Sequence, residues 1–200
     1  MLFRSVSVDS FARYQREDAW TWEHMALCRA RPLFGSAQAR EALAGLIRDV
    51  LSATRDPAKL REDVLKMRAD MAAAKPQRGP LDVKLMRGGL VDSEFLVHYL
   101  QLRTGAGLAP GLEHAIIGLA AAGHLPVGYE RHHLDLTRIL VAARLLAPDG
   151  DRPPQTAAAA LANACGCADY EGLLQAIADA RHGIAEQWEA VFGQQLEIEA

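Results

Sequence analysis

Apolar residues recur at helical spacing along almost the whole chain. Between residues 36 and 54 they fall on one side of a helix, at Leu43, Leu46, Ile47, Val50 and Leu51. Ser36 is a typical N-cap for this helix, and Asp56 followed by Pro57 predicts the N-cap and first turn of the next one. The second helix has its own apolar stripe and is expected to end near Lys75. The stripe comprises Leu60, Val64, Met67 and Met71.

The same periodicity predicts further helices over residues 92–104, 111–123 and 129–147, and two more after a polar loop at 148–155. The last has the clearest pattern, with Tyr170, Leu173, Ile177, Ile184, Trp188 and Val191 at heptad-like positions. Residues 81–85 are the only weak candidate for a strand. We therefore predict an all-α fold, a helical bundle of about eight helices.

Near the start of the chain, Trp20 and Glu23 lie in a stretch that mixes aromatic and charged residues. If residues 16–31 formed one helix, Arg16, Trp20, Glu23, Leu27 and Arg31 would share one stripe. The simplest interpretation is an indole packed in the core and flanked by surface ion pairs. The alternative is that the charged side chains support a site.

A second candidate lies at residues 84–95, where Lys84, Arg87 and the pair Gly88-Gly89 precede a predicted helix. Glycines allow a ligand to approach the backbone, and the free N–H groups at a helix N-terminus favour anions. Lys84 and Arg87 would add charge-assisted contacts to phosphate oxygens. The structural alternative is a glycine turn in which Asp92 acts as an N-cap and the charges are solvated.

Composition narrows the class of protein. Half of the 200 residues are hydrophobic, which is enough for a sizeable core, and the net charge of −3 disfavours a dedicated nucleic-acid binder. No apolar run approaches the roughly 20 residues that span a bilayer, and no secretory signal is visible. Three cysteines do not suggest a disulfide framework. Together with the absence of a long apolar run, this predicts a cytoplasmic protein without a membrane partner.

Other reactive side chains give weaker signals. Cys165 and Cys167 have a spacing that could hold a metal, but no second pair completes a tetrahedral site, so free thiols are expected. The adjacent His132 and His133 point apart on a helix. We therefore predict no metal ligands within this chain.

Two segments together resemble a known family. Residues 19–31, Ala-Trp-Thr-Trp-Glu-His-Met-Ala-Leu-Cys-Arg-Ala-Arg, are similar to the segment after the second nucleotidyltransferase core of bifunctional glutamine-synthetase adenylyltransferases/adenylyl-removing enzymes. Residues 87–102 resemble that family's glycine-pair, Asp-x-Glu-Phe signature, and residues 56–61 between them also fit. The resemblance is strong to about Leu102 and covers the remainder only as a helical tail.

The resemblance implies an enzyme that transfers AMP from ATP to a tyrosine of glutamine synthetase, under the control of glutamine and the PII signalling protein. Its Gly-Ser and paired aspartates, which hold Mg²⁺, have no match here, so the catalytic residues are expected in an upstream core and the chain alone is expected to be inactive. On this interpretation the helical segment completes the nucleotide pocket. The nucleotide-binding candidates are Lys84, Arg87, Gly88, Gly89, Asp92 and Glu94, with Glu23, Arg29 and Arg31 as supporting residues.

The resemblance also suggests a division of the chain. Residues 1–6 are expected to be a truncated or artefactual start, 7–147 a helical domain that follows a nucleotidyltransferase core, and 148–200 a C-terminal helical tail. One alternative is a non-catalytic regulatory module that binds PII or glutamine synthetase. Another is a helical scaffold in which the motifs are coincidental.

Overall fold

The computed structural model describes residues 6–198. Within that range all regular secondary structure is helical. Its nine helices are α1 (Val8–Glu17), α2 (Thr21–Leu27), α3 (Ala37–Leu51), α4 (Pro57–Ala74), α5 (Leu90–Thr104), α6 (Leu112–Ala121), α7 (Glu130–Leu146), α8 (Gln155–Ala164) and α9 (Tyr170–Phe192). The all-α prediction is confirmed for these residues. The predicted start at residues 1–6 lies almost entirely outside them.

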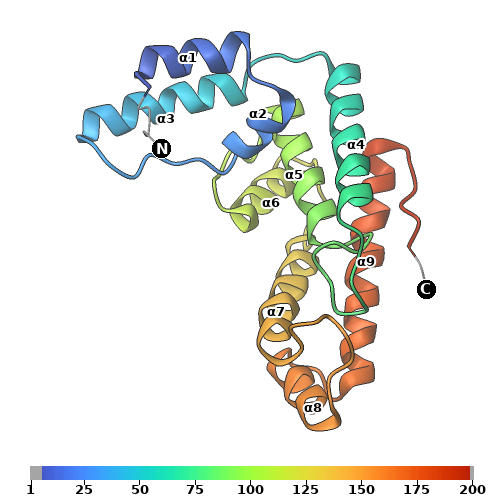
Figure 1. Ribbon diagram of the computed structural model, residues 1–200. Coiled ribbons are helices and arrows are strands. Elements are labelled where there is room, and N and C mark those ends of the chain that lie inside the picture. Colours follow the sequence, from blue (N-terminus) through green and yellow to red (C-terminus); the bar gives the residue numbers. More distant parts are fainter. Residues whose placement is uncertain (1–5, 199–200) are drawn as a thin grey trace.

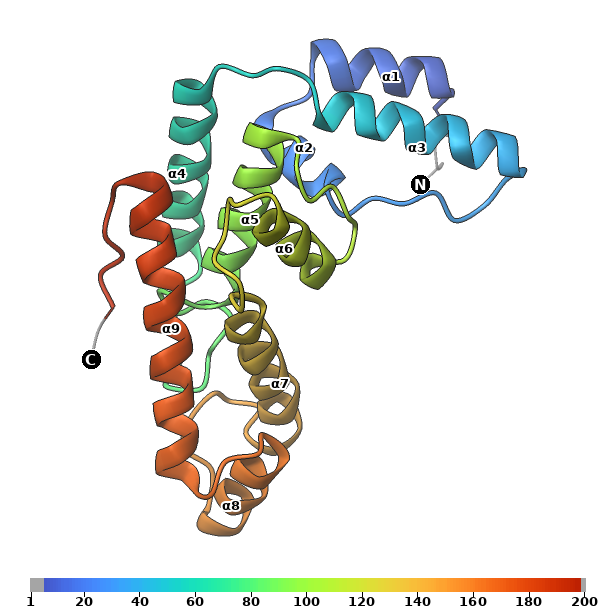
Figure 2. The ribbon, with the colours of Figure 1, turned by 180° about the vertical axis from the view of Figure 1, so that it is seen from behind.

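The helices form a long body and a projecting arm (Figures 1 and 2). In the body, α5 packs against α4, α6, α7 and α9, while α8 closes the end between α7 and α9. The arm consists of α1 and α3, which pack on each other and reach the body through α2. Because α9 packs along both α7 and α5, the helices on either side of residue 147 share one core. The predicted domain division at that point stays a prediction.

Several helix boundaries follow the capping residues in the sequence. The hydroxyl of Ser36 accepts the Ala39 N–H at 3.2 Å, and the carboxylate of Asp56 accepts the Ala58 N–H at 2.8 Å. These bonds satisfy donors that a helix leaves free in its first turn. The expected starts of α3 and α4 are therefore confirmed.

Residues 16–31 do not form one helix. The chain leaves α1 after Glu17 and restarts at Trp20, whose backbone is extended and whose N–H donates to Glu23 Oε2 at 2.9 Å. Glu23 thereby caps the new helix from its third position. The expected stripe does not form, and Trp20 is 71% exposed instead of packed in the core.

The core runs through the whole body. Its largest fully buried side chains include Trp188 and Phe192 of α9, and the Phe192 ring lies tilted against both Trp188 and Tyr99 of α5. The expected apolar stripe of the last helix is buried as predicted, except that Val191 is only partly covered. Among residues 6–198 no helix is both long and apolar enough to cross a bilayer.

Candidate functional site

The loop between α4 and α5, residues 75–89, carries four of the six predicted nucleotide-binding residues. Leu81, Val83 and Met86 turn into the core and anchor the loop. The carboxylate of Asp82 accepts backbone N–H groups from Arg78 at 3.2 Å and from Leu85 at 3.3 Å. Residues 81–85 therefore form a fixed turn and not the strand that was weakly indicated, and Lys84 is left exposed on its surface.

The glycine pair packs against the protein itself. Gly88 has a φ of +73°, and a Cβ there would lie 2.6 Å from the carbonyl oxygen of Arg181 in α9. A Cβ on Gly89 would lie 2.6 Å from the carbonyl oxygen of Val83. Both residues are buried. What the glycines permit in this structure is the close approach of α9 and of the loop's own backbone.

The N–H groups at the start of α5 already have partners. Leu90 N–H donates to Val83 O at 3.0 Å, and Val91 N–H donates to Lys84 O at 3.1 Å. The Gly88 N–H is held by Asp92 Oδ2 at 2.8 Å. An anion near this helix would therefore contact side chains, because these amides face the loop.

Asp92 lies in the first turn of α5, which is N-capped by Gly89, and its side chain is fully buried. Arg68 Nε of α4 lies 2.6 Å from Asp92 Oδ1, and Arg87 Nη1 lies 3.6 Å from the same oxygen. Burying a carboxylate requires partners of this kind. Asp92 is thus neither an N-cap nor open to a ligand, and it fixes the position of two arginines.

Sequence reasoning missed Arg68, although a signal was present. Arg68 continues the buried stripe of Leu60 and Val64 at intervals of four residues, and all three side chains are buried. A cation on an apolar stripe needs a buried counter-charge. The search for a partner would have led to Asp92.

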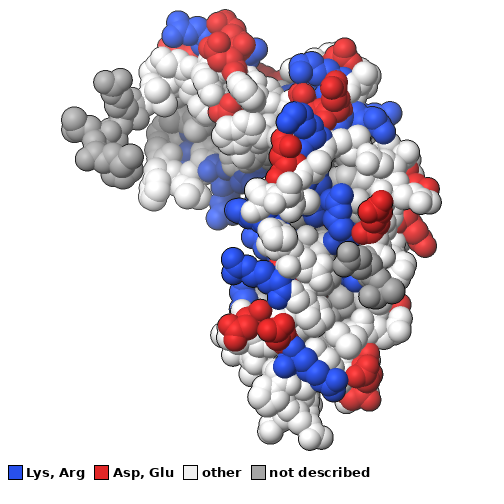
Figure 3. Space-filling model, turned by 45° about the vertical axis from the view of Figure 1, so that its right-hand side comes forward, with Lys and Arg blue, Asp and Glu red and all other residues white. Residues whose placement is uncertain are grey.

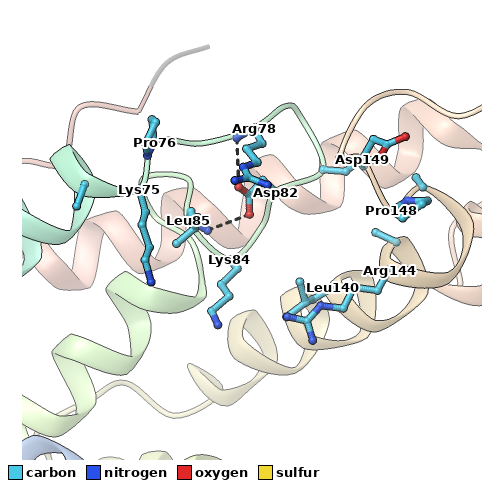
Figure 4. Close-up of a pocket in the computed structure, with 15 residues that line it drawn as sticks. Lys75, Pro76, Arg78, Asp82, Lys84, Leu85, Leu140, Arg144, Pro148 and Asp149 are labelled. Atoms are coloured by element: carbon cyan, nitrogen blue, oxygen red, sulfur yellow. Dashed lines mark hydrogen bonds between the residues drawn. The ribbon is translucent and has the colours of Figure 1, made fainter.

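Lys84 and Arg87 face two different cavities. Lys84 borders a cavity of about 420 Å³ between the loop and α7, together with Lys75, Arg78 and Arg144 (Figure 4). Arg87 borders a second cavity, of about 700 Å³, lined also by Arg181 and by residues of the segment after α9. Lys75 borders both. The structure therefore does not bring Lys84 and Arg87 to one point, and nucleotide binding by them stays a prediction.

Of the supporting residues, only Arg29 reaches the predicted site. Its Nη1 lies 3.9 Å from Glu94 Oε2, and both side chains are partly exposed. Glu23 instead accepts the Tyr14 hydroxyl at 2.7 Å and caps α2, and Arg31 is exposed in the segment after α2. The hydrogen bond from the Trp20 N–H, and then that from the Tyr14 hydroxyl, lower the pKa of Glu23.

The remaining candidates are the cysteines and possible metal ligands. Cys28 and Cys165 are buried, Cys167 is partly exposed, and all three are free thiols. Within residues 6–198 no group of three or more His, Cys, Asp or Glu side chains is arranged to hold a metal ion. Asp92, the buried carboxylate of the predicted site, already pairs with two arginines. The described residues therefore do not fit Mg²⁺.

Comparison with known proteins supplies the assignment that geometry alone does not. Residues 3–45 match the family model described as glutamate-ammonia ligase adenylyltransferase. A bifunctional glutamine synthetase adenylyltransferase/adenylyl-removing enzyme of Rhizobium meliloti is 35% identical over 186 residues, which cover 88% of this chain and 19% of the relative.

A relative of the same name from Nitrosomonas europaea is 33% identical over 198 residues, or 94% of this chain and 21% of the relative. That from Bradyrhizobium diazoefficiens is 50% identical over 96 residues, or 48% of this chain and 10% of the relative. The chain is homologous to a segment of these adenylyltransferases. The resemblance seen in the sequence is confirmed.

The chain spans about a fifth or less of the length of these adenylyltransferases. Similarity to the two longer matches extends over nearly all of its own residues. The helical body and the arm are thus both parts of the homologous segment.

Proposed function

We propose that this chain is the helical C-terminal part of an enzyme that transfers AMP from ATP to a tyrosine of glutamine synthetase. The observation that carries the proposal is homology over 186 and 198 residues to bifunctional glutamine synthetase adenylyltransferases. Nitrogen assimilation in the cytoplasm is the setting that this function implies.

In this proposal the helical body completes a nucleotide pocket whose catalytic residues belong to an upstream nucleotidyltransferase core. Lys84 and Arg87 neutralise phosphate charge from two cavities that share Lys75 in their linings, and the buried Asp92 holds Arg87 in place through their 3.6 Å contact. Arg29 and Glu94 brace the start of α5 against α2. Gly88 and Gly89 contribute by letting α9 and the loop pack at the base of the pocket.

Mg²⁺ belongs to the upstream core in this proposal. A metal held by the core would align the phosphates of ATP. The part of the chain between residues 6 and 198 supplies cations and no matching carboxylate cluster. The 200-residue chain alone is therefore expected to be inactive in AMP transfer.

Exposed apolar side chains support a contact between the segment of residues 20–34 and that core. Trp22 is 55% exposed, Trp20 71%, and Phe34, in the segment between α2 and α3, 90%. All three fall within residues 3–45, which match the adenylyltransferase family model. Large exposed apolar groups on one segment are typical of a surface that another domain covers.

The test uses the full-length enzyme. Replacing Lys84 or Arg87 with alanine should raise the KM for ATP about tenfold, because each change removes a charge-assisted contact to phosphate. Arg131→Ala is the matched control, since Arg131 is an exposed cation on α7 that lines neither cavity. Kinetics unchanged from those of the parent enzyme would remove Lys84 and Arg87 from the site.

A second candidate function is a non-catalytic module that binds glutamine synthetase or PII. It is favoured by an apolar groove on α7, where Leu145 is 79% exposed, Val141 56% and Leu134 38%. Isothermal titration of this chain against PII without ATP tests it. Saturable binding that Val141→Asp abolishes would support the module, and absence of heat would exclude PII as its partner.

A further inference from the structure

The cavity beside Lys84 gathers four cations from two segments that lie far apart in the sequence, the loop of residues 75–89 and the end of α7. Lys75 is the C-cap of α4, Arg78 and Lys84 belong to the following loop, and Arg144 lies in the last turn of α7. Figure 4 shows Arg144 extending from α7 toward Lys84. Figure 3 shows basic side chains gathered at mid-height of the molecule, below the arm. None of the four cations has an ion-pair partner within 4.0 Å among residues 6–198.

The cavity is built on a fixed crossing of two loops. Leu81 N–H donates to Gly150 O at 3.0 Å, which ties the Arg78–Lys84 segment to the turn after α7. At this crossing Gly79 has a φ of +136°, and a Cβ there would lie 2.6 Å from Gly150 O. The crossing holds Arg78 beside the turn that follows Arg144. A ligand would meet cations whose backbone positions are already fixed, which lowers part of the entropic cost of binding.

The carboxylates at this cavity do not neutralise it. Its lining contains Asp82 and Asp149 against the four cations. The two oxygens of Asp82 already accept the Arg78 and Leu85 N–H groups. The cavity therefore keeps an excess of positive charge, which attracts an anion of more than one charge.

The neighbouring cavity is a weaker candidate because two of its three cations, Arg87 and Arg181, are already engaged. Arg87 lies against Asp92 at 3.6 Å, and Arg181 Nε donates to Arg87 O at 2.9 Å. Glu197 adds a negative charge to its lining. An anion there would compete with contacts that the protein already makes.

We propose that the cavity of Lys75, Arg78, Lys84 and Arg144 binds a chain of phosphate groups, either that of a nucleotide or a free polyphosphate. Its volume of about 420 Å³ is in the range of small-molecule sites, and Leu81, Leu85 and Leu140 provide apolar walls beside the cations. Lysine and arginine side chains arriving from different directions match the several oxygens of linked phosphates. The proposal deepens the proposed function, on which it rests for the role of Lys84.

The experiment measures binding to the 200-residue chain by isothermal titration at constant ionic strength, with ATP, AMP, pyrophosphate, inorganic phosphate and citrate. ATP and pyrophosphate should bind with a defined stoichiometry, and more tightly than AMP and inorganic phosphate. Tighter binding of ATP than of pyrophosphate would identify a nucleotide as the ligand, and equal binding a free polyphosphate. Citrate binding as tight as that of pyrophosphate would overturn the phosphate assignment.

Variants then locate the site. Arg144→Gln should weaken pyrophosphate binding about tenfold. Arg138→Gln is the matched control, because it removes the same charge from the same helix but lines the apolar groove on α7. Circular dichroism verifies that each variant is folded. Equal losses in both variants, or no binding to the parent chain, would overturn the proposal.

The two proposals fail separately. If pyrophosphate binding depends on Arg87 and not on Arg144, the cavity assignment is wrong while the proposed AMP transfer is untouched. If the chain binds pyrophosphate through Arg144 but the full-length enzyme transfers no AMP to glutamine synthetase, the proposed function fails and the cavity stands.

Discussion

Arg68 Nε lies 2.6 Å from Asp92 Oδ1, and both side chains are buried between α4 and α5. The pair joins a helix to the start of the next across a loop of 15 residues, numbers 75–89. Asp92 also holds the Gly88 N–H and lies near Arg87, so one carboxylate fixes the α4 contact, the glycine turn and a half-buried arginine. The geometry of the candidate site depends on this residue even though a ligand does not reach it.

Breaking this pair should be strongly destabilising. Arg68→Met leaves the carboxylate of Asp92 without its buried partner and should lower the free energy of unfolding by about 3–5 kcal/mol. Urea denaturation measures the change. Lys66→Met in the same helix removes an exposed cation paired with Asp70 and should have little effect. A comparable loss in the two variants would contradict the role assigned to the buried pair.

The glycine turn should tolerate no side chain. Gly88→Ala places a Cβ 2.6 Å from Arg181 O at a φ of +73° and should cost about 2–4 kcal/mol of stability, because backbone strain and a steric clash add. Gly105→Ala, at a φ of +69° but with its nearest neighbour 3.8 Å away, should cost about 1 kcal/mol. Thermal unfolding of the two variants separates strain from close packing. A Gly88 variant no less stable than the Gly105 variant would show that α9 does not press on this turn.

Stability should fall as the pH is lowered through the range in which histidine ordinarily titrates. His98 is buried, and Gln101 Nε2 donates to Gly107 O at 2.7 Å, so Gln101 Oε1 accepts the His98 Nδ1–H at 2.8 Å. Its Nε2 is then buried without a hydrogen-bond partner among residues 6–198, and burial lowers the pKa of His98. Burial likewise lowers the pKa of His24 and His133.

The direction of this change in stability follows from proton uptake by the histidines. As the pH falls through about 6.5, the unfolded chain binds protons at these histidines while the folded chain does not, so the free energy of unfolding decreases. Below the lowered pKa values of the folded state, these histidines are protonated in both states and no longer decrease the free energy of unfolding. Denaturation at pH 7.5, 6.5 and 5.5 measures the slope, and His98→Asn, whose amide can still donate to Gln101, should make it shallower. An unchanged slope would show that His98 is protonated equally in both states.

The three thiols should react in a fixed order. Burial raises the pKa of Cys28 to about 12 and also raises that of Cys165, whereas Cys167 is partly exposed. Because the thiolate is the nucleophile, iodoacetamide at pH 8 should label Cys167 first and Cys28 last in the folded chain. Peptide mass spectrometry over time gives the order. Early labelling of Cys28 would mean that α2 opens readily from the body.

Much of the fold was predictable because helices are encoded locally. The apolar spacing and the caps at Ser36 and Asp56 predicted α3 and α4, and the heptad-like pattern predicted α9. The break between α1 and α2 was not predicted. It depends on Glu23 capping the Trp20 N–H, and a glutamate three residues after a tryptophan is an unusual capping pair.

The candidate site was predictable only in part. The charged residues and the glycine pair of the loop could be identified in the sequence, and the same residues carry part of the family resemblance. Their sequence proximity suggested that Lys84 and Arg87 act at one point, but the turn organised by Asp82 sends them into different cavities.

The sequence by itself determined the helical class, most helix boundaries and the relationship to the adenylyltransferases, because all three are carried by local spacing and by residue identity. Only the tertiary structure decided that Asp92 is buried against Arg68, that Gly88 faces α9, and that Arg144 joins Lys84 at one cavity. These contacts link residues 24, 93 and 60 positions apart. Such distances are set by how helices pack across the core, and no local pattern records them.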